Sequence, residues 1–296
     1  MDHVLTLIAP AADLLTEDRL VAVRQYLRSL GGCVGAADWL SPGRVCDLIV
    51  GGLAPEQADS AARHALDGAP IDVVAQPVEG RRKLLLVADM DSTMVEGETL
   101  DELADFAGIK DQIAAITARA MNGEIGFEAA LKERIGLLNG LPVSALDETW
   151  GRIQYMGGAR TLVQTMKAHG AYAVLVSGGF KFFTSRVRQE CGFDVDLANE
   201  FIFTDGRLTG VVEPILGRET KLSTLINSAA ERQLPLSLAV AVGDGANDLD
   251  MIRAAGLGVA YHAKPVVASE ARIRIDHNDL TALLYAQGYR DSEFVG

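Results

Sequence analysis

The spacing of hydrophobic and polar positions divides the chain into two parts with different patterns. In the first 78 residues, short apolar runs and helical periodicities follow one another in the order strand, helix, strand, strand, helix, strand. This βαββαβ order predicts a small α+β domain over residues 1–78. The expected strands are Val4–Ile8, Gly35–Leu40, Cys46–Val50 and Ile71–Val74, and the expected helices are Glu17–Leu30 and Pro55–Leu66.

The polar segment Glu79–Lys83 makes a linker to a second domain, expected over residues 79–296. From Leu84 onward, apolar runs of strand length alternate with helical patterns, which is typical of an α/β fold with a Rossmann-like parallel sheet. The expected strands are Leu84–Ala88, Ala171–Val176, Leu236–Val242, Leu257–Ala260 and Arg272–Ile275. The expected helices are Ala159–His169, Phe182–Cys191, Thr220–Gln233, Asp248–Ala255 and Pro265–Ala271.

Between the first two of these strands the pattern is helical alone. Leu100–Trp150 contains no clear strand, so we expect a small helical cap inserted at about residues 98–155. The segments near Gly97 and Gly151–Gly158 are candidate hinges for this cap. Further on, Phe201–Val212 carries an Asp-Gly turn between β-rich arms and predicts a hairpin.

Composition narrows the class of partner. A net charge of −13 argues against binding to nucleic acid or to an anionic membrane, because both require a basic surface, and favours a small-molecule substrate. The cysteines Cys33, Cys46 and Cys191 form no CxxC pair and are expected to be reduced thiols in a cytoplasmic protein. The N-terminus lacks the basic region of a signal peptide, and no apolar run approaches the ~18 residues of a membrane span.

Polar side chains follow three of the expected strands at the point where each strand ends. The first strand is followed by Asp89, Asp91 and Thr93, the second by Ser177, Gly178 and Gly179, and the third by the segment Gly243–Asp248. Ligands bind beyond the carboxyl ends of the strands in an open parallel sheet, so we expect these groups to converge. Two adjacent carboxylates at the end of a buried strand repel each other, which requires solvent or a cation to compensate them.

The chemistry of these groups is mutually consistent. Asp89, Asp91 and Asp244 offer the hard oxygen ligands that Mg²⁺ prefers, and the amides after Ser177 can hold phosphate oxygens. Lys221, at the start of a helix, adds a positive charge for a phosphate and for a nucleophilic carboxylate. Each feature alone is more often a solvated loop, a turn or a surface residue. Together, each at the end of its own strand, they predict a site for phosphoryl transfer.

These residues resemble the four motifs of the haloacid dehalogenase superfamily: DxDxT at Asp89–Thr93, Ser177, Lys221, and GDGxND at Gly243–Asp248. Longer stretches, over about two thirds of the chain, resemble the phosphoserine phosphatase family: "DMDSTMVEGETLDELA", "ITARAMNGEIGFEAALKERIGLLNGL", "LVSGGF" and "VGDGANDLDMIRAAGLGVA". Met90 departs from this pattern, since the family often has phenylalanine there. The N-terminal domain resembles a ferredoxin-like ACT domain in topology alone, a family that often binds amino acids or dimerises. A homodimer is therefore a further expectation.

The resemblance implies roles for the residues at the strand ends. Asp89 would be the nucleophile that forms an aspartyl-phosphate, and Asp91 the general acid and then the base. Asp89 and Asp244 would bind Mg²⁺ through their side chains and Asp91 through its carbonyl, with Asp248 supporting them. The phosphate would lie against Ser177, Gly178, Gly179 and Lys221, with Asn247 nearby.

The resemblance also implies a substrate and assigns cap residues to it. Glu98 would bind the ammonium of O-phospho-L-serine and Arg134 its carboxylate, while Met121 and Phe127 would close over it. The expected activity is Mg²⁺-dependent hydrolysis of O-phospho-L-serine, the last step of L-serine biosynthesis. Two alternatives stay open. One is a phosphatase or phosphotransferase for a related metabolite such as phosphohomoserine, and the other is an amino-acid sensor with a vestigial catalytic half.

Overall fold

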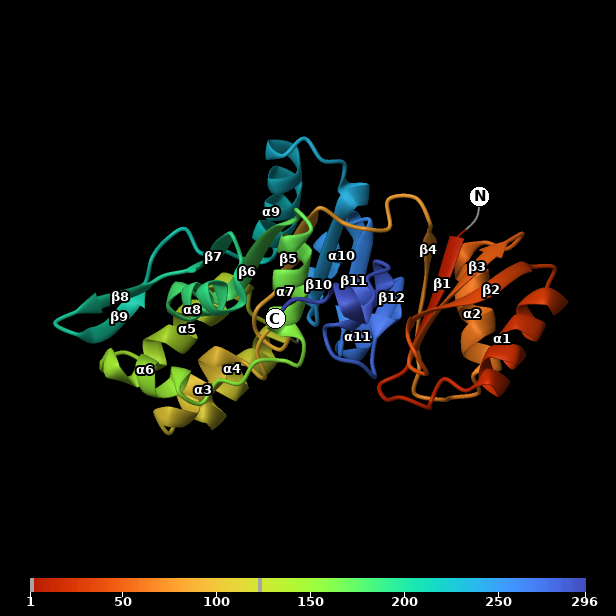
Figure 1. Cartoon of the computed structure of the whole chain (residues 1–296). Helices are drawn as coiled ribbons and strands as arrows, with labels where there is room; N and C mark the ends of the chain where they lie inside the picture. The colour runs from red at the N-terminus through yellow and green to blue at the C-terminus, as the bar shows by residue number, and fades with distance from the viewer. Residues whose placement is uncertain (1–2, 122–123) are drawn as a thin grey trace.

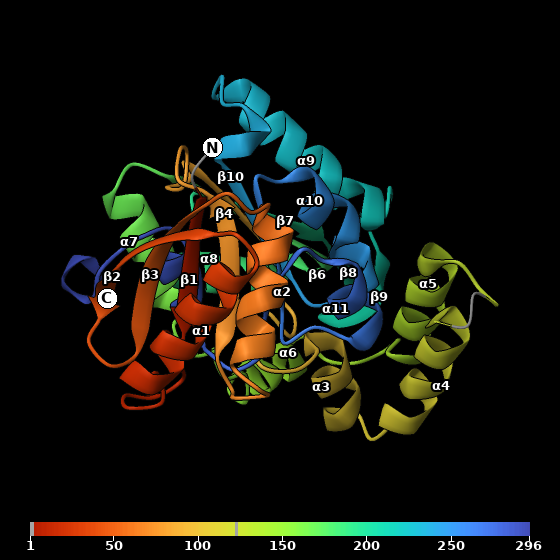
Figure 2. The same ribbon diagram turned by 90° about the vertical axis from the view of Figure 1, so that its right-hand side faces the viewer.

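The computed structural model describes residues 3–121 and 124–296 and contains two larger sheets and one hairpin (Figure 1). The first sheet is antiparallel in the order β2-β3-β1-β4, which confirms the predicted ferredoxin-like arrangement. Its strands are β1 (His3–Ile8), β2 (Cys33–Ser41), β3 (Val45–Gly51) and β4 (Asp72–Pro77). Helices α1 (Glu17–Ser29) and α2 (Pro55–Ala65) cover its outer face, which Figure 2 shows from the front.

The second sheet is parallel and has six strands in the order β12-β11-β10-β5-β6-β7. The strands are β5 (Leu85–Ala88), β6 (Tyr172–Phe180), β7 (Val195–Asn199), β10 (Ala239–Gly243), β11 (Leu257–Tyr261) and β12 (Ile273–Ile275). Helices α9 (Arg218–Glu231) and α10 (Leu249–Ala254) pack on one face. The other face packs against α7 (Ala159–Ala168), α8 (Lys181–Cys191) and α12 (Ala282–Ala286). Helix α11 (Pro265–Glu270) packs beside α10 and β11.

Two elements of this sheet and its cover were not predicted, and one strand begins later than expected. Strand β7 contains Asp196, a residue type that is rare in strands. The side chain is accommodated because Thr184 donates to it at 2.7 Å and Arg188 pairs with it at 3.0 Å. Helix α12 is too short for its periodicity to be detected. The expected strand Leu236–Val242 begins at Ala239, since residues 236–238 form a 3₁₀ turn.

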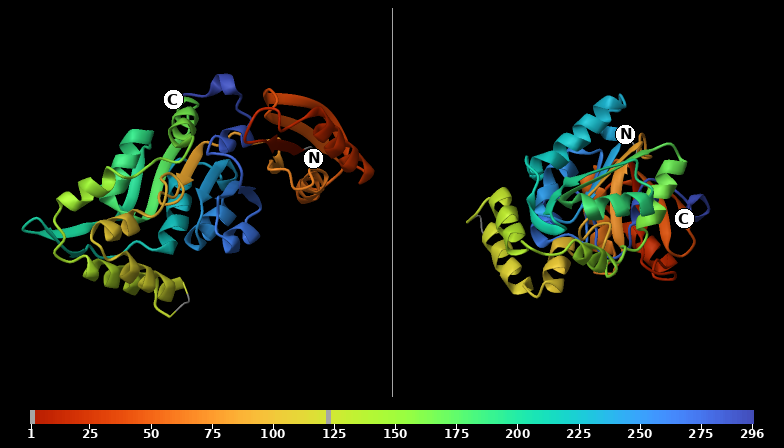
Figure 3. Two further views of the ribbon diagram at one scale, coloured as in Figure 1. Left: turned by 90° about the horizontal axis from the view of Figure 1, so that it is seen from below. Right: turned by 90° about the vertical axis from the view of Figure 1, so that its left-hand side faces the viewer.

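The predicted helical cap lies between β5 and β6. It consists of α3 (Thr99–Phe106), α4 (Lys110–Met121), α5 (Phe127–Leu137) and α6 (Ser144–Trp150). The predicted hairpin, β8 (Phe201–Thr204) with β9 (Arg207–Val211), packs against α5. The cap and the hairpin occupy the end of the molecule far from the ferredoxin-like domain (Figure 3).

The two connections between the cap and the sheet run side by side. The backbone N–H of Glu96 donates to the Gln154 carbonyl at 2.8 Å, and that of Met156 donates to the Met94 carbonyl at 3.0 Å. Gly158 at the end of the second connection has φ of +76°, a conformation that glycine adopts readily. The cap is thus tied to the core by a short two-stranded ribbon.

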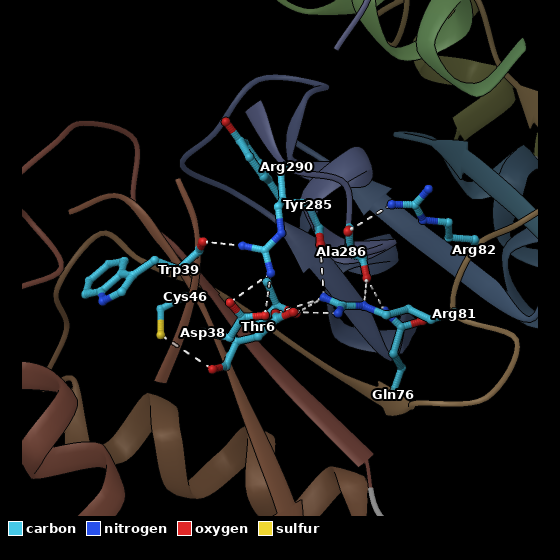
Figure 4. A network of polar contacts seen from close by, with 12 residues as sticks. Thr6, Asp38, Trp39, Cys46, Gln76, Arg81, Arg82, Tyr285, Ala286 and Arg290 are labelled. Atoms are coloured by element: carbon cyan, nitrogen blue, oxygen red, sulfur yellow. Dashed lines mark hydrogen bonds and ion pairs between the residues drawn. The ribbon is translucent and has the colours of Figure 1, made fainter. Parts of the chain in front are cut away.

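Polar side chains join the ferredoxin-like sheet to the second domain. The Arg81 guanidinium donates to Asp47 and Thr6 of the first sheet, both at 2.8 Å, and to the carbonyls of Tyr285 and Ala286. Figure 4 shows Arg81 reaching both sides of this contact, with Arg290 beside it. The boundary at residues 78–79 stays a prediction.

Two further expectations concern the whole chain. The three cysteines are free, with Cys46 and Cys191 buried and Cys33 exposed. In residues 3–121 and 124–296, none of the helices combines the length and the apolar character that crossing a membrane demands.

Candidate active site

The carboxyl ends of β5, β6 and β10 bring the predicted polar groups together. Carboxylate oxygens of Asp89, Asp244 and Asp248 lie within 4.8 Å of one another. The Lys221 Nζ, from the first turn of α9, lies 2.8 Å from Asp89 Oδ1 and 2.6 Å from Asp248 Oδ1. All four of these side chains are buried. The convergence that the sequence predicted is therefore present.

Asp89 is held by one of its two carboxylate oxygens. The backbone N–H of Met90 donates to Oδ1 at 2.8 Å, and Lys221 pairs with the same oxygen. Burial raises the pKa of Asp89 well above its usual range, the nearby charge of Asp248 adds to this, and Lys221 opposes both. This carboxylate therefore needs more positive charge than Lys221 supplies in order to stay ionised.

Asp91 has different partners from Asp89. Its Oδ1 accepts the backbone N–H of Thr99 at 2.7 Å, and its Oδ2 accepts the Ser177 hydroxyl at 3.1 Å. Burial raises the pKa of Asp91, while these hydrogen bonds and the charge of Lys221 lower it. A raised pKa favours the protonated carboxyl, which is the form a general acid requires. The two aspartates thus sit in environments suited to different tasks.

Asp248 fits into the space that a side chain on Gly243 would fill. A Cβ atom on Gly243 would lie 2.3 Å from Asp248 Cγ. Asp248 Oδ2 accepts the backbone N–H of Gly245 at 2.9 Å, and Oδ1 faces Lys221. The glycine at the end of β10 therefore lets Asp248 reach the centre of the site.

The acidic group Asp89, Asp244 and Asp248 fits a divalent cation. All three donors are hard carboxylate oxygens, and burial raises the pKa of Asp244 as well as that of Asp89. A buried group of like charges with this pKa pattern is stabilised by a cation. The Asp91 side chain lies outside this group and is hydrogen-bonded to Thr99 and Ser177.

The Thr93 hydroxyl is buried and has no hydrogen-bond partner within the described residues, whereas its backbone N–H donates to the Met90 carbonyl.

The predicted phosphate loop, Ser177–Gly179, lies within β6 and not after it, because the strand expected to end at Val176 continues to Phe180. A register shift between Val176 and Phe180 interrupts the regular pairing with β7 at this segment. The Gly179 backbone N–H donates to Ser177 Oγ at 2.8 Å. Asn199 at the end of β7 donates to the Gly178 carbonyl at 2.9 Å and accepts the backbone N–H of Leu216 at 2.7 Å. Asn199 therefore fixes this loop against the segment that leads into α9.

Asn247 and the cap residue Arg134 lie near this centre. Asn247 is half-buried beside Gly245 in the loop after β10. Arg134 is half-buried on α5, and burial lowers its pKa against the opposing charges of Asp101 and Glu98. The side chain of Met121 lies outside the described part of the chain, so its expected role is not addressed by the structure.

Phe127 rests on two glycines of the core. A Cβ atom on Gly178 would lie 3.1 Å from the Phe127 ring, and one on Gly217 would lie 3.5 Å from it. Because glycine has no side chain, Gly178 and Gly217 leave space for the Phe127 ring at the start of α5. We call this space the glycine slot. The cap thus touches the phosphate loop directly.

Replacing Gly178 with alanine tests the glycine slot. We expect Gly178→Ala to displace Phe127 and to raise protease cleavage of the cap connections, because the added methyl group would lie only 3.1 Å from the ring and the ring must move away from it. Limited proteolysis of the full chain measures this. Gly136→Ala is the control, since Gly136 lies within α5, where alanine fits the backbone, and a Cβ there has no neighbour within 4 Å. Equal cleavage of both variants would contradict the role of the slot.

Sequence reasoning missed Lys264, Thr99 and Asn199. The Lys264 Nζ lies 3.5 Å from Asp244 Oδ2 and 3.9 Å from Glu98 Oε1, and its backbone N–H donates to the Asp244 carbonyl at 3.1 Å. β11 ends at the same edge of the sheet as β10, so the polar residues after it were detectable by the same argument. Thr99 acts through its backbone, and Asn199 lies on the unpredicted strand, so neither gave a signal.

An α/β core with an aspartate, a lysine and an acidic group at the strand ends, under a helical cap, defines a hydrolase of the haloacid dehalogenase type. The chain belongs to this family: the haloacid dehalogenase-like hydrolases match residues 86–253. It is similar to curated phosphoserine phosphatases. It shares 43% identity with that of Archaeoglobus fulgidus over 216 residues, 72% of this chain and 63% of that protein. It shares 44% identity with that of Streptococcus thermophilus over 199 residues, 67% of this chain and 93% of that protein.

The two-domain arrangement also has a counterpart among solved structures. A HAD family hydrolase from Salmonella enterica serovar Typhi superposes with a TM-score of 0.83 at 28% identity, over 96% of this chain and 98% of that one. The matched segments span 52 to 63% of the length of three of the curated relatives. Activity and substrate are therefore proposals for this chain.

Proposed function

We propose that this protein is a phosphoserine phosphatase that hydrolyses O-phospho-L-serine to L-serine and phosphate. The observation that supports the proposal is that Glu98 and Arg134 both lie close enough to Asp91 to interact with its charge, and that Glu98 also lies 3.9 Å from Lys264. A carboxylate and a guanidinium match the ammonium and the carboxylate of the substrate, with its phosphate at Asp89. The identity to curated phosphoserine phosphatases supports the same substrate.

In the first half of the reaction, Asp89 attacks phosphorus. Lys221 and the Met90 N–H engage Oδ1, which leaves Oδ2 to form the new P–O bond. The bond between phosphorus and the serine oxygen breaks, and Asp91 transfers its proton to that oxygen. Ser177 and the amides of the phosphate loop hold the phosphoryl oxygens as charge shifts toward them.

In the second half, water attacks the phosphoryl group on Asp89. Asp91, now ionised, takes a proton from this water, so Asp89 leaves as a carboxylate and phosphate forms. The Ser177 hydroxyl and the Thr99 N–H keep the Asp91 carboxylate in place through both steps. The proton that left with serine is thereby replaced, and the site returns to its starting state.

We propose Mg²⁺ as the cation of the acidic group. Asp89 and Asp244 would hold it through their side chains and Asp91 through its carbonyl, with Asp248 bonded to Lys221 in support. When bound, Mg²⁺ neutralises the charge on the phosphoryl oxygens and on Asp89. A cytosolic location and a homodimer stay predictions from the sequence.

A substrate panel tests the function. We expect kcat/KM with Mg²⁺ to be highest for O-phospho-L-serine, lower for O-phosphohomoserine and lowest for p-nitrophenyl phosphate, because only the first places both amino-acid groups against Glu98 and Arg134. Steady-state phosphate release measures this, with EDTA as the control. Preference for O-phosphohomoserine would favour the alternative substrate. Absence of turnover with every substrate would favour a sensor.

Glu98 gives the proposed activity a distinctive dependence on pH. Desolvation by its surroundings and the charge of Asp91 raise the pKa of Glu98 to about 7, while Lys264 opposes them, and the side chain itself remains 48% exposed. Because only the ionised carboxylate attracts an ammonium, we expect KM for phosphoserine to rise as the pH falls through this value. KM for p-nitrophenyl phosphate, which has no ammonium, serves as the control. Parallel changes for the two substrates would contradict this role of Glu98.

A further inference from the structure

The loop of residues 276–281, between β12 and α12, contacts three separate parts of the molecule. One is the ferredoxin-like sheet, the second is the loop after β11 that carries Lys264, and the third is the chain's return from the cap. We call this segment the junction loop. Its position decides how these three parts sit relative to one another.

Asp72 of β4 holds the junction loop from the ferredoxin-like side. The residue is 0% exposed. Its Oδ1 accepts the backbone N–H of Asp276 at 2.9 Å, and its Oδ2 accepts that of His277 at 3.2 Å and Asn278 Nδ2 at 2.8 Å. Asn278 Nδ2 also donates to the Ile8 carbonyl in β1 at 2.9 Å. Leaving such buried groups unpaired is costly, so this carboxylate fixes the loop.

The junction loop holds the segment that carries Lys264. His262 Nε2 donates to the Asn278 carbonyl at 3.0 Å, and the His262 backbone N–H donates at 2.9 Å to the carbonyl of Ile275, the last residue of β12, just before the loop. These bonds stabilise His262 at φ of +41°, which is uncommon for a residue with a side chain. Two residues later, Lys264 faces Asp244 and Glu98. Asp72 is therefore connected to the active site through three links. These are its hydrogen bond to Asn278, the hydrogen bond between Asn278 and His262, and the two residues that lead from His262 to Lys264.

The junction loop also seats the return connection of the cap. The Leu280 backbone N–H donates to the Gly157 carbonyl at 3.0 Å. A Cβ on Gly157 would lie 3.1 Å from Asp279 Cβ, and one on Gly158 would lie 2.8 Å from the Thr281 backbone nitrogen. These glycines let the connection lie directly on the loop.

We propose that Asp72 is a positioning residue for the active site and acts through the junction loop on Lys264 and on the cap connection. The inference rests on the proposed function. It makes the ferredoxin-like domain a part of the catalytic scaffold, although Asp72 lies outside the site itself. Because Lys264 lies 3.5 Å from Asp244 and 3.9 Å from Glu98, a displaced junction loop shifts the groups that line the site and so raises KM for the substrate.

The test compares Asp72→Asn with Asp47→Asn in the full chain. Asp47 is also buried and pairs with Arg81 across the same domain contact, but its bonds go to Arg81 and Thr6 (Figure 4 shows these two partners). We expect Asp72→Asn to raise KM for phosphoserine about tenfold with a smaller change for p-nitrophenyl phosphate. We expect Asp47→Asn to keep the wild-type KM for both substrates.

Hydrogen exchange gives a second readout that needs no activity. We expect faster exchange at residues 157–158 and 262–264 in Asp72→Asn and unchanged exchange there in Asp47→Asn. Equal behaviour of the two variants in both measurements would overturn the proposal. Lack of phosphoserine turnover by the wild type would instead overturn the proposed function, and hydrogen exchange would still decide the role of Asp72.

Asn278→Ala provides an independent variant in case Asp72→Asn fails to fold. It removes the bond to Asp72 but leaves the backbone N–H groups of Asp276 and His277 in place. We expect the same selective rise in KM, at a smaller size. A further test compares the single variant Asn278→Asp, which places two carboxylates together, with the double variant that also carries Asp72→Asn. We expect the single variant to raise KM for phosphoserine and the double variant to reverse part of that rise. Wild-type kinetics in Asn278→Ala, or no recovery in the double variant, would contradict the proposal.

Discussion

Replacing Asp89 with asparagine is expected to lower phosphoserine turnover by about 10³-fold or more, because the amide cannot form the new bond to phosphorus. In the absence of metal, the thermal stability of Asp89→Asn is not expected to fall below that of the wild type. Burial and Asp248 hold the pKa of Asp89 above its usual range, so the ionised group destabilises the folded protein as the pH rises through that folded pKa. In EDTA at pH 8, Asp89→Asn should therefore have a Tm equal to or above that of the wild type.

Mg²⁺ separates the two effects of this variant. The wild type should gain Tm when Mg²⁺ is added, since binding to the folded state alone stabilises it, and Asp89→Asn should gain little. Asp194→Asn is the control, because Asp194 pairs with Lys167 at a partly exposed site away from the centre. If Asp89→Asn kept Mg²⁺-dependent turnover, Asp89 would not be the nucleophile and the sensor alternative would gain support.

Replacing Lys221 with methionine is expected to have the largest effect on stability. Lys221 is 2% exposed and lies between Asp89 and Asp248, so its loss leaves two buried carboxylates facing each other. Breaking a buried ion pair on one side costs about 3–5 kcal/mol of unfolding free energy. The loss should grow as the pH rises, because the carboxyls can no longer take up protons to relieve the repulsion. Chemical denaturation at a series of pH values measures this loss of unfolding free energy.

Lys132→Met is the matched control for this change. Lys132 pairs with Glu128 and Glu213 on the surface, where ion pairs contribute little. We expect an unchanged unfolding free energy for this variant. Added Mg²⁺ should restore part of the stability of Lys221→Met but not its turnover. A variant as stable as the wild type at high pH would show that the Lys221 charge is not what compensates Asp89 and Asp248.

The sequence was informative wherever chemistry and periodicity coincided. Asp89 and Asp244 were placed correctly because each follows a clear apolar strand, and a parallel sheet brings strand ends together. Ser177 reaches the same edge, although β6 continues past it to Phe180. Thr99 could not be found, because it bonds to Asp91 through a backbone N–H that any residue has. Strand β7 was missed because Asp196 breaks its apolar pattern, and the reason it is tolerated lies in side chains of α8.

Contacts between the domains were beyond prediction for a different reason. Asp72 and Asn278 are 206 residues apart in the chain, and neither belongs to a recognisable motif. A buried carboxylate in a strand of the ferredoxin-like domain was itself a signal, since such groups require partners. The sequence alone does not say where those partners are.

The paired connections of the cap have a consequence for the direction in which it can move. Two segments joined by the bonds of Glu96 to Gln154 and of Met156 to Met94 resist sliding past each other, because sliding would break both bonds. The two connections bend together far more easily, as a two-stranded ribbon. Opening of the cap is therefore expected to be a rotation about one axis, and Phe127 would leave and re-enter the glycine slot along a single arc.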